Sequence, residues 1–206
     1  MSDISKRLFD IIGAVVGLVI LSPILAVLAT WIKLDSEGPV FYRGIRVGRG
    51  ERPFPIYKFR TMVVDAEQVG GPDTAEDDPR ITGSGTFLRK YKLDELPQLI
   101  NVLTGEMSFV GPRPEVQERI ALYSEEEKAI LSVRPGITDY ASIEFSNEGE
   151  ILAGSDDPAK AYLEKIKPEK VRLGLEYVNS RSLWVDLRIL ARTAIVIFKG
   201  GSKEGA

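Results

Sequence analysis

The sequence predicts a helix-rich, mixed α/β fold whose first segment is a membrane-embedded helix-break-helix. Three observations carry this prediction: an uncharged apolar run near the N-terminus, two strand-like segments separated by a turn, and a series of helical patterns after them. We therefore expect a re-entrant membrane segment over residues 1–36, a cytosolic domain over 37–199 and a disordered tail over 200–206.

The apolar run covers residues 11–32 and contains no charged side chain. As one straight helix it would be roughly 33 Å long, which is enough to cross the hydrocarbon core of a bilayer. Ser22 and Pro23 interrupt it near the middle. Proline lacks the N–H that would bond the carbonyl of Val19, and a carbonyl without a partner is costly in lipid. We expect the Ser22 hydroxyl to be the replacement donor.

Positively charged residues stand on both sides of this run. Lys6 and Arg7 precede it, and seven more follow within residues 33–60. Because positive residues mark the cytosolic side of a membrane, a single span would have to carry one of these groups across. A segment that enters and leaves by one leaflet keeps both in the cytosol, so we favour the re-entrant arrangement. A kinked single span and a cleaved signal peptide are the alternatives.

Composition restricts the chemistry that the chain can perform. The 206 residues carry a net charge of −3, with a basic surplus in the first 60 residues that suits anionic lipids and phosphates. The chain has no strongly basic domain of the kind that would indicate a nucleic-acid partner. The chain has no Cys and no His, which excludes thiolate and imidazole catalysis and the usual zinc sites. Reactive groups must be carboxylates, Arg, Lys, Tyr, Ser or Thr, and Mg²⁺ is the metal expected on oxygen ligands.

The cytosolic part begins with a predicted hairpin and continues with helices. Residues 40–47 and 54–62 are rich in β-branched and aromatic residues and flank turn residues 48–51. An acidic segment over 65–79 is expected to be a mobile loop. Helices are predicted over 124–132, 158–166, 169–179 and 183–198. The last of these is amphipathic, with polar members Asp186, Arg188, Arg192 and Lys199, and would pack on the core or lie at the membrane surface.

Two adjacent carboxylates, Asp94 and Glu95, are the strongest candidates for chemistry. They precede the apolar helical stripe of residues 96–103, where Asp94 is suited to be the N-cap and Gly105 to end the helix. The alternative to a catalytic role is a structural one, in which the two carboxylates cap the helix and complement its dipole. However, nearby basic residues such as Arg89 would keep Asp94 ionised and could bind phosphate. An aspartate that attacks phosphorus forms an acyl phosphate, and Mg²⁺ would screen the repulsion between the two anions.

Several stretches together resemble one bacterial enzyme family. They are KRLFD before the Ser-Pro-interrupted apolar run, then YKFRTM, LDELPQLINVLTGEMSFVGPRP and VRPGIT. In this order they are similar to the monotopic polyprenol-phosphate phosphoglycosyl transferases, in particular the small PglC-like members. The resemblance runs from about residue 6 to residue 199. It implies transfer of a phospho-sugar from a UDP-sugar to undecaprenyl phosphate with release of UMP, at the cytosolic face of the bacterial inner membrane.

The same resemblance implies roles for individual residues. Asp94 would be the nucleophile of a two-step, ping-pong reaction, and Glu95 its partner in holding Mg²⁺ or the lipid phosphate. Arg89 and Arg113 would hold phosphate groups. Further phosphate or nucleotide contacts would come from Lys58, Arg60 and Arg134. At the membrane, headgroup contacts would come from Lys6 and Arg7, and the re-entrant break from Ser22 and Pro23. The family's fold implies amphipathic helices on the membrane surface, and two copies of the chain could form a homodimer.

The sequence departs from the family in one loop, residues 139–145. Where many relatives read Gly, an apolar residue and then Ala-Gln after Thr138, this chain reads DYASIEF. The sugar, the glycan that is built and the role of this loop are therefore not predicted. Two other function classes remain open: a glycosyltransferase that passes only the sugar and releases UDP, and a non-catalytic scaffold whose arginines bind anionic lipid. The first usually shows an Asp-x-Asp pair, which this chain lacks.

Overall fold

The computed structural model describes residues 3–66, 78–146 and 158–200, and confirms a helix-rich α/β fold with small sheets. The predicted mobile loop lies mainly on residues outside these ranges, as does nearly all of the predicted tail. The elements, in chain order, are α1 (Asp3–Asp35), β1 (Phe41–Tyr42), β2 (Ile45–Val47), η1 (Arg49–Glu51), β3 (Pro53–Pro55), β4 (Lys58–Phe59), α3 (Gly83–Lys90), η2 (Leu93–Glu95), α4 (Gln98–Thr104), β5 (Ser108–Val110), α5 (Gln117–Ile120), η3 (Glu127–Ser132), β6 (Gly136–Thr138), α6 (Tyr140–Glu144), α8 (Pro158–Ala161), η4 (Tyr162–Ile166), α9 (Lys167–Ser180) and α10 (Leu183–Gly200).

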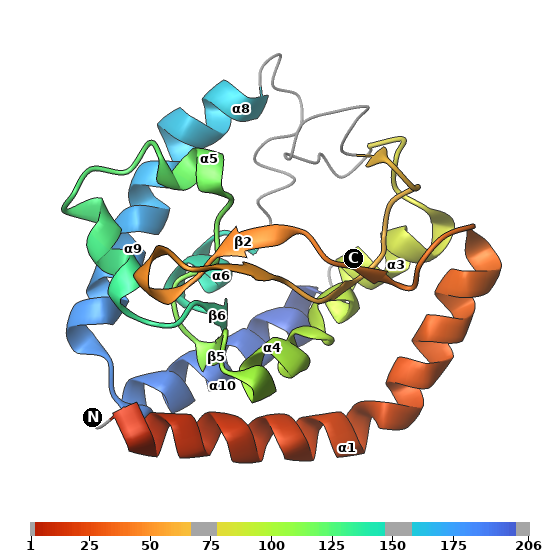
Figure 1. Ribbon diagram of the computed structural model, residues 1–206, viewed down its shortest axis with the longest axis horizontal. Helices are drawn as coiled ribbons and strands as arrows, with labels where there is room; N and C mark the ends of the chain where they lie inside the picture. Colours follow the sequence, from red (N-terminus) through yellow and green to blue (C-terminus); the bar gives the residue numbers. More distant parts are fainter. Residues whose placement is uncertain (1–2, 67–77, 147–157, 201–206) are drawn as a thin grey trace.

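Helix α1 runs along one edge of the molecule and bends midway (Figure 1). The predicted break is therefore a bend inside one continuous helix that contains Pro23. The Ser22 hydroxyl donates to the Val19 carbonyl at 2.8 Å, as predicted, and so replaces the N–H that proline lacks. Within the described residues, α1 is the one helix long and apolar enough to cross a membrane, judged by length and composition.

Both ends of α1 are attached to the same globular body. Near its start, Asp10 accepts a hydrogen bond from the Ser108 hydroxyl at 3.0 Å. At its end, Asp35 accepts from the amide and the hydroxyl of Ser84 at 2.9 and 2.8 Å. A straight helix of this length would reach about 50 Å, so the bend is what allows both attachments. The outer face stays exposed, with Val19, Ile20 and Val27 each about two-thirds accessible (68%, 67% and 67%).

The predicted hairpin is present, but each of its strands is interrupted. Strand β1 pairs antiparallel with β4, and β2 with β3. At the interruption, the Tyr57 amide donates to the side chain of Asn101 at 2.8 Å, and the Asn101 amide group donates to the Pro55 carbonyl at the same distance. A buried side chain from α4 thus satisfies backbone groups that a continuous ladder would have used, and it fixes the hairpin on α4.

A second small sheet carries the two loops that the sequence motifs emphasised. Strands β5 and β6 are parallel, with Ser108 opposite Gly136 and Val110 opposite Thr138. A side chain at Gly136 would place its Cβ 2.1 Å from the Gly111 nitrogen, so the two backbones can approach only because this residue is glycine. The loop after β5 carries Arg113, and the residues just before β6 carry Arg134.

Helices α9 and α10 confirm the helices predicted over 169–179 and 183–198, and they pack against the second sheet. The Tyr177 hydroxyl, from α9, donates to the Val110 carbonyl at 2.9 Å and to Asp186 at 2.8 Å. The expectation that Asp186 is a surface member of an amphipathic helix is wrong, because its side chain is fully buried. Trp184 and Leu187 of α10 are exposed instead, at 69% and 47%.

Candidate active site

The Asp94–Glu95 pair lies in a short turn, η2, between helices α3 and α4. Lys92 precedes the turn with a positive φ of 55°, a left-handed conformation that is uncommon for a residue with a side chain. The predicted N-cap role of Asp94 is wrong. Helix α4 starts at Gln98, with Pro97 at its N-cap, so Asp94 stands four residues before the helix. The Gly105 prediction is correct, since this residue ends α4 in the left-handed conformation.

Glu95 is neutralised by two basic side chains. Lys58, from β4, donates to its carboxylate at 2.9 Å. Arg113, from the loop after β5, forms a two-pronged ion pair with the same carboxylate. Burial works to raise the pKa of Glu95, but the charges of Arg113 and Lys58 outweigh burial and hold this pKa well below its usual range. Glu95 is therefore ionised and already fully engaged.

Asp94 has a different environment from its neighbour. Its side chain is 8% exposed and makes no hydrogen bond or ion pair with any residue in the part of the chain that the structure describes. Burial raises the pKa of Asp94 above its ordinary value, and the negative charge of Glu95 adds to this effect. The charges of Lys58, Arg89 and Lys92 act in the opposite direction. The pair thus consists of one carboxylate held by two cations and one buried carboxylate with no partner among the described residues.

Arg89 lies in the last turn of α3 and is held by Thr61, next to the strand that carries Lys58. Its Nε donates to the Thr61 hydroxyl at 2.9 Å. Thr82 caps α3 by accepting from the Gly85 amide at 3.1 Å, and a Cβ on Gly85 would lie 2.1 Å from the Thr61 carbonyl oxygen. Glycine therefore lets α3 approach the hairpin closely enough for this contact. Burial lowers the pKa of Arg89, while the charge of Asp94 raises it.

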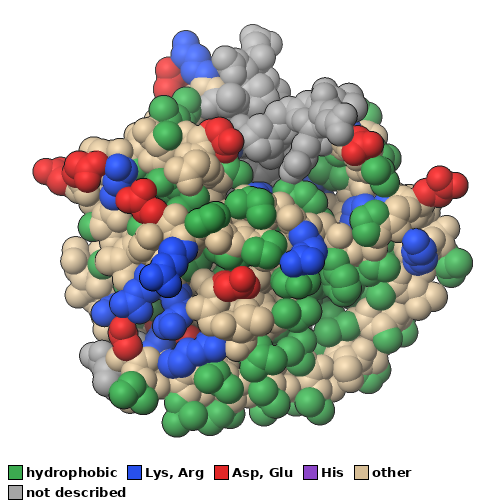
Figure 2. All heavy atoms as spheres, viewed as in Figure 1, with side chains coloured by type: hydrophobic (Ala, Val, Ile, Leu, Met, Phe, Trp, Pro, Cys, Tyr) green, Lys and Arg blue, Asp and Glu red, His purple; other side chains and the backbone are tan. Residues whose placement is uncertain are grey.

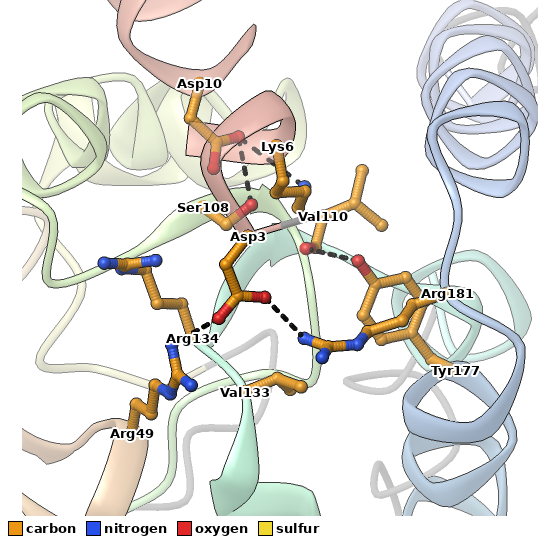
Figure 3. Close-up of a pocket in the computed structure, with 10 residues that line it drawn as sticks. All are labelled: Asp3, Lys6, Asp10, Arg49, Ser108, Val110, Val133, Arg134, Tyr177 and Arg181. Atoms are coloured by element: carbon orange, nitrogen blue, oxygen red, sulfur yellow. Dashed lines mark hydrogen bonds and ion pairs between the residues drawn. The ribbon is translucent and has the colours of Figure 1, made fainter. Parts of the chain in front are cut away.

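Two further residues of the predicted phosphate set are engaged elsewhere. The guanidinium of Arg60 donates to the carbonyls of Ser36, at 2.8 Å, and Glu37, and is 6% exposed. It fixes the turn that follows α1. Arg134 donates through Nε to the Gly105 carbonyl at 2.8 Å and lines a cavity at the start of α1 (Figure 3). The structure therefore brings together Lys58, Arg89, Asp94, Glu95 and Arg113, but not Arg60 or Arg134.

The headgroup contacts of Lys6 and Arg7 stay a prediction, and in the structure both side chains are engaged within the protein. Lys6 forms buried ion pairs with Asp186 at 2.7 Å and Asp10 at 3.6 Å. Arg7 donates to the carbonyls of Val102 and Leu103 at 2.5 and 2.8 Å, at the C-terminal end of α4. Carbonyls at a helix end attract a guanidinium, and buried carboxylates require a cation, so both side chains face the protein.

Sequence reasoning gave no individual role to two residues near the arginines of the site, Thr61 beside Arg89 and Asp139 near Arg113. Thr61 holds Arg89, and its only signal was its place inside the YKFRTM stretch. Asp139 opens the unusual loop and is 3% exposed, where it accepts from the amide and hydroxyl of Ser142 at 2.6 Å each. Burial raises the pKa of Asp139, and the charge of Arg113 acts against this. The role of Asp139 in the structure is to cap α6.

Comparisons with known proteins identify the family of this chain. The family model described as bacterial sugar transferase matches residues 1–200. The chain is 39% identical over 204 residues to the UDP-glucose:undecaprenyl-phosphate glucose-1-phosphate transferase of Escherichia coli K12, which covers 98% of this chain and 41% of that protein. It is 38% identical over 198 residues to the UDP-N-acetylgalactosamine-undecaprenyl-phosphate N-acetylgalactosaminephosphotransferase of Aeromonas hydrophila, covering 95% of this chain and 44% of that protein.

A relative of similar size also matches. The exopolysaccharide production protein ExoY of Sinorhizobium fredii is 35% identical over 217 residues, which cover 97% of this chain and 89% of that protein. The chain thus spans about two-fifths of the two larger relatives and nearly all of the smaller one. Since the family model covers almost the whole sequence, the chain belongs to the bacterial sugar transferase family.

Proposed function

We propose that this protein is a phosphoglycosyl transferase that moves a phospho-sugar from a UDP-sugar to undecaprenyl phosphate through a covalent intermediate on Asp94. The relatives act on undecaprenyl phosphate by their names, which supports the substrate classes. The observation that supports the mechanism is that the two carboxylates differ in their partners. Glu95 is engaged by Lys58 and Arg113, whereas Asp94 has no partner within the described residues and is bordered by cations.

In the first step, an Asp94 carboxylate oxygen attacks the phosphorus that carries the sugar. A bond forms between that oxygen and phosphorus, and the bond from phosphorus to the bridging oxygen of the diphosphate breaks. UMP leaves with the bridging oxygen and its electron pair, so no proton transfer is required. The sugar phosphate is then an acyl phosphate on Asp94.

In the second step, a phosphate oxygen of undecaprenyl phosphate attacks the same phosphorus. The bond to Asp94 breaks, the carboxylate is regenerated, and the product is a lipid-linked diphosphate sugar. The need for an ionised Asp94 explains the surrounding cations, because burial alone would favour the protonated and unreactive form.

The basic residues have separable roles in this scheme. Arg89 stands beside Asp94 and would hold the phosphate that is attacked. Lys58 lowers the pKa of Asp94 and binds Glu95 at the same time. Arg113 reaches Glu95 from a different loop, with its side chain 37% exposed, and would add positive charge near the substrate phosphates. Charge that develops on phosphate oxygens is stabilised by these fixed cations.

A magnesium ion fits this site only if substrate provides most of its ligands. The described residues contain no group of three acidic side chains that could hold a metal ion. Glu95 is bound by Lys58 and Arg113, so Asp94 is the available protein ligand, and Glu95 would join it only by releasing these cations. Mg²⁺ commonly takes one or two carboxylates together with substrate phosphates. When bound, it would neutralise diphosphate charge and help UMP to leave.

The bent helix α1 supports the re-entrant proposal, in which both ends of the helix lie at the cytosolic face of the inner membrane. The chain has no cysteine, so single cysteines can be placed at will. Ser2→Cys, ahead of α1, and Leu34→Cys, at a position that is 82% exposed, should both react with an impermeant maleimide in inside-out vesicles. Ile20→Cys should be protected. Labelling of the two ends from opposite sides would support a kinked span instead.

The function is tested by the identity of the released nucleotide. Purified protein is given a panel of UDP-sugars with undecaprenyl phosphate and Mg²⁺, and the products are separated by chromatography. We expect UMP and a lipid-linked diphosphate sugar, and the panel identifies the sugar. Release of UDP would show a sugar-only glycosyltransferase. No turnover with any donor, from protein that is folded and membrane-bound, would favour a scaffold. Pairing of two copies stays a prediction, which light scattering in nanodiscs would test.

A further inference from the structure

A surface at the N-terminal end of α1 gathers arginines from distant parts of the chain. Arg49 comes from η1, Arg134 from the segment before β6, and Arg181 from the end of α9. All three line one cavity together with Asp3, the first residue of α1 (Figure 3). The cavity measures about 20 Å³, room for roughly one water molecule, so a larger ligand could bind only at its mouth.

The charges at this mouth are unequal. Asp3 is shared between Arg49 at 3.2 Å and Arg181 at 3.5 Å. Arg134 bonds a neutral carbonyl, that of Gly105. The cavity also borders Lys6 and Asp10, but Lys6 is taken by buried carboxylates deeper in the protein. At the surface, therefore, three guanidinium groups face one carboxylate. Arginines held this close together repel one another unless an anion lies between them.

This basic surface adjoins the apolar face of α1. Ile4 and Leu8, one helical turn apart at the same end of α1, are 80% and 58% exposed. Figure 2 shows Lys and Arg side chains gathered above the start of α1, with a continuous band of hydrophobic side chains along the helix below them. Arg49 and Arg181 are themselves 45% and 38% exposed. Cations at the border of an apolar membrane face lie at the level of lipid headgroups.

We propose that Arg49, Arg134 and Arg181 bind the phosphate headgroup of an anionic phospholipid, and that Asp3 occupies this position when no such lipid is bound. A lipid fits better than free phosphate for two reasons. Its acyl chains would cover Ile4 and Leu8 while its phosphate meets the arginines, whereas free phosphate gains only the screened attraction of half-exposed charges. In this proposal the headgroup is bound by these three arginines instead of by Lys6 and Arg7, the residues expected from the sequence.

The test measures lipid preference in reconstituted membranes. The full chain is placed in phosphatidylcholine vesicles with a trace of spin-labelled phosphatidylglycerol or spin-labelled phosphatidylcholine. Electron spin resonance then gives the ratio of the two association constants. We expect the wild type to favour phosphatidylglycerol, and the variant Arg49→Gln/Arg181→Gln to lose this preference by about fivefold for each arginine. Asp3→Asn removes the competing carboxylate and should raise the ratio, which a misfolded variant would not do.

The matched control is Lys160→Gln/Lys165→Gln. It removes the same charge from exposed positions on α8 and η4, which Figure 1 places on the side of the molecule opposite to α1, and it should leave the ratio unchanged. An equal loss in this control, or an unchanged ratio in the arginine variant, would overturn the proposal. So would displacement of the lipid probe by inorganic phosphate at constant ionic strength, since the site would then bind free phosphate. No sugar donor is present, so Asp94→Asn should keep the wild-type ratio, and the outcome is independent of the proposed catalysis.

Discussion

Two clusters of acidic and basic side chains in this molecule differ in one respect. In the buried cluster of Lys6, Asp10 and Asp186 beneath the start of α1, the one cation is paired with both carboxylates, which also accept from Ser108 and Tyr177. In the cluster around η2, Glu95 is satisfied, while Asp94 makes no ion pair or hydrogen bond with the residues that the structure describes. A cluster in which each charged group has a partner stabilises the attachment of a helix, whereas a cluster that contains an unpartnered carboxylate can act on a ligand.

Asp94→Asn should produce the largest loss of activity of these variants. It tests most directly whether the cluster around η2 serves catalysis and not stability. The amide cannot act as a nucleophile, so we expect UMP release to fall by about 10⁴-fold. Stability should be unchanged or higher, because a buried charge without a partner is removed. The measurement is the rate of UMP release beside the thermal midpoint in detergent. Near-normal turnover would remove Asp94 from the mechanism.

Asp186→Asn should have the opposite signature. It breaks the buried pair with Lys6, and loss of one member of such a pair costs roughly 3–5 kcal/mol of the free energy of unfolding. The rate per folded molecule should stay close to that of the wild type. Chemical unfolding in detergent measures the first quantity. Glu125→Gln, at a side chain that is 89% exposed, is the control and should change little. A stable but inactive Asp186→Asn protein would contradict the separation of the clusters.

Helix α1 and the Lys6–Asp10–Asp186 cluster also show what the sequence could and could not predict. The apolar run, Pro23 and the Ser22 hydroxyl predicted the bend and its repair, because these are local backbone effects. The internal contacts of Lys6, Arg7 and Asp186 were not predicted. Lys6 meets Asp186 near the other end of the chain, and Arg7 meets carbonyls 95 and 96 residues away, while charge pattern alone suggested solvent or lipid. The N-cap error at Asp94 has a local cause, since Lys92 adopts a left-handed conformation that no residue type there predicts.

The candidate site was predictable in its members more than in its arrangement. The absence of His and Cys made Asp94 and Glu95 the candidates for chemistry, and the family resemblance implied the phosphate roles of Arg89 and Arg113. Which carboxylate is free depends on Lys58 and Arg113 reaching Glu95 from two other elements, and only the tertiary fold decides this. Arg60 belongs to a motif but serves the turn after α1, a role that depends on where the helix ends.

Lys58→Met tests, through the pH dependence of activity, whether nearby cations keep Asp94 ionised. The reactive form of Asp94 is ionised, so activity is present above its pKa and is lost as the pH falls through it. Burial raises this pKa and the charge of Lys58 lowers it. Removal of that charge should therefore move the acid limb of kcat/KM to higher pH. The pH profile of kcat/KM measures the shift, and Lys128→Met, at a surface pair with Glu125, is the control. A shift to lower pH would contradict the assignment.

Ser22→Ala should give the smallest effect. It leaves the Val19 carbonyl without a donor, and we expect a loss of about 1 kcal/mol in the free energy of unfolding. Thr30→Ala is the matched control, because the hydroxyl of Thr30 bonds the Ala26 carbonyl in a turn where the backbone N–H is not missing. Equal losses in the two variants would show that the bend at Pro23 does not depend on Ser22.

The most direct test of the central claim is the mass of the protein after incubation with its UDP-sugar donor and Mg²⁺ but no lipid acceptor. The account predicts one added sugar phosphate, located on Asp94 by peptide analysis, together with an equal amount of UMP. Addition of undecaprenyl phosphate should remove the adduct. Normal turnover with no adduct on Asp94 under rapid quenching, or an adduct on another residue, would contradict the account.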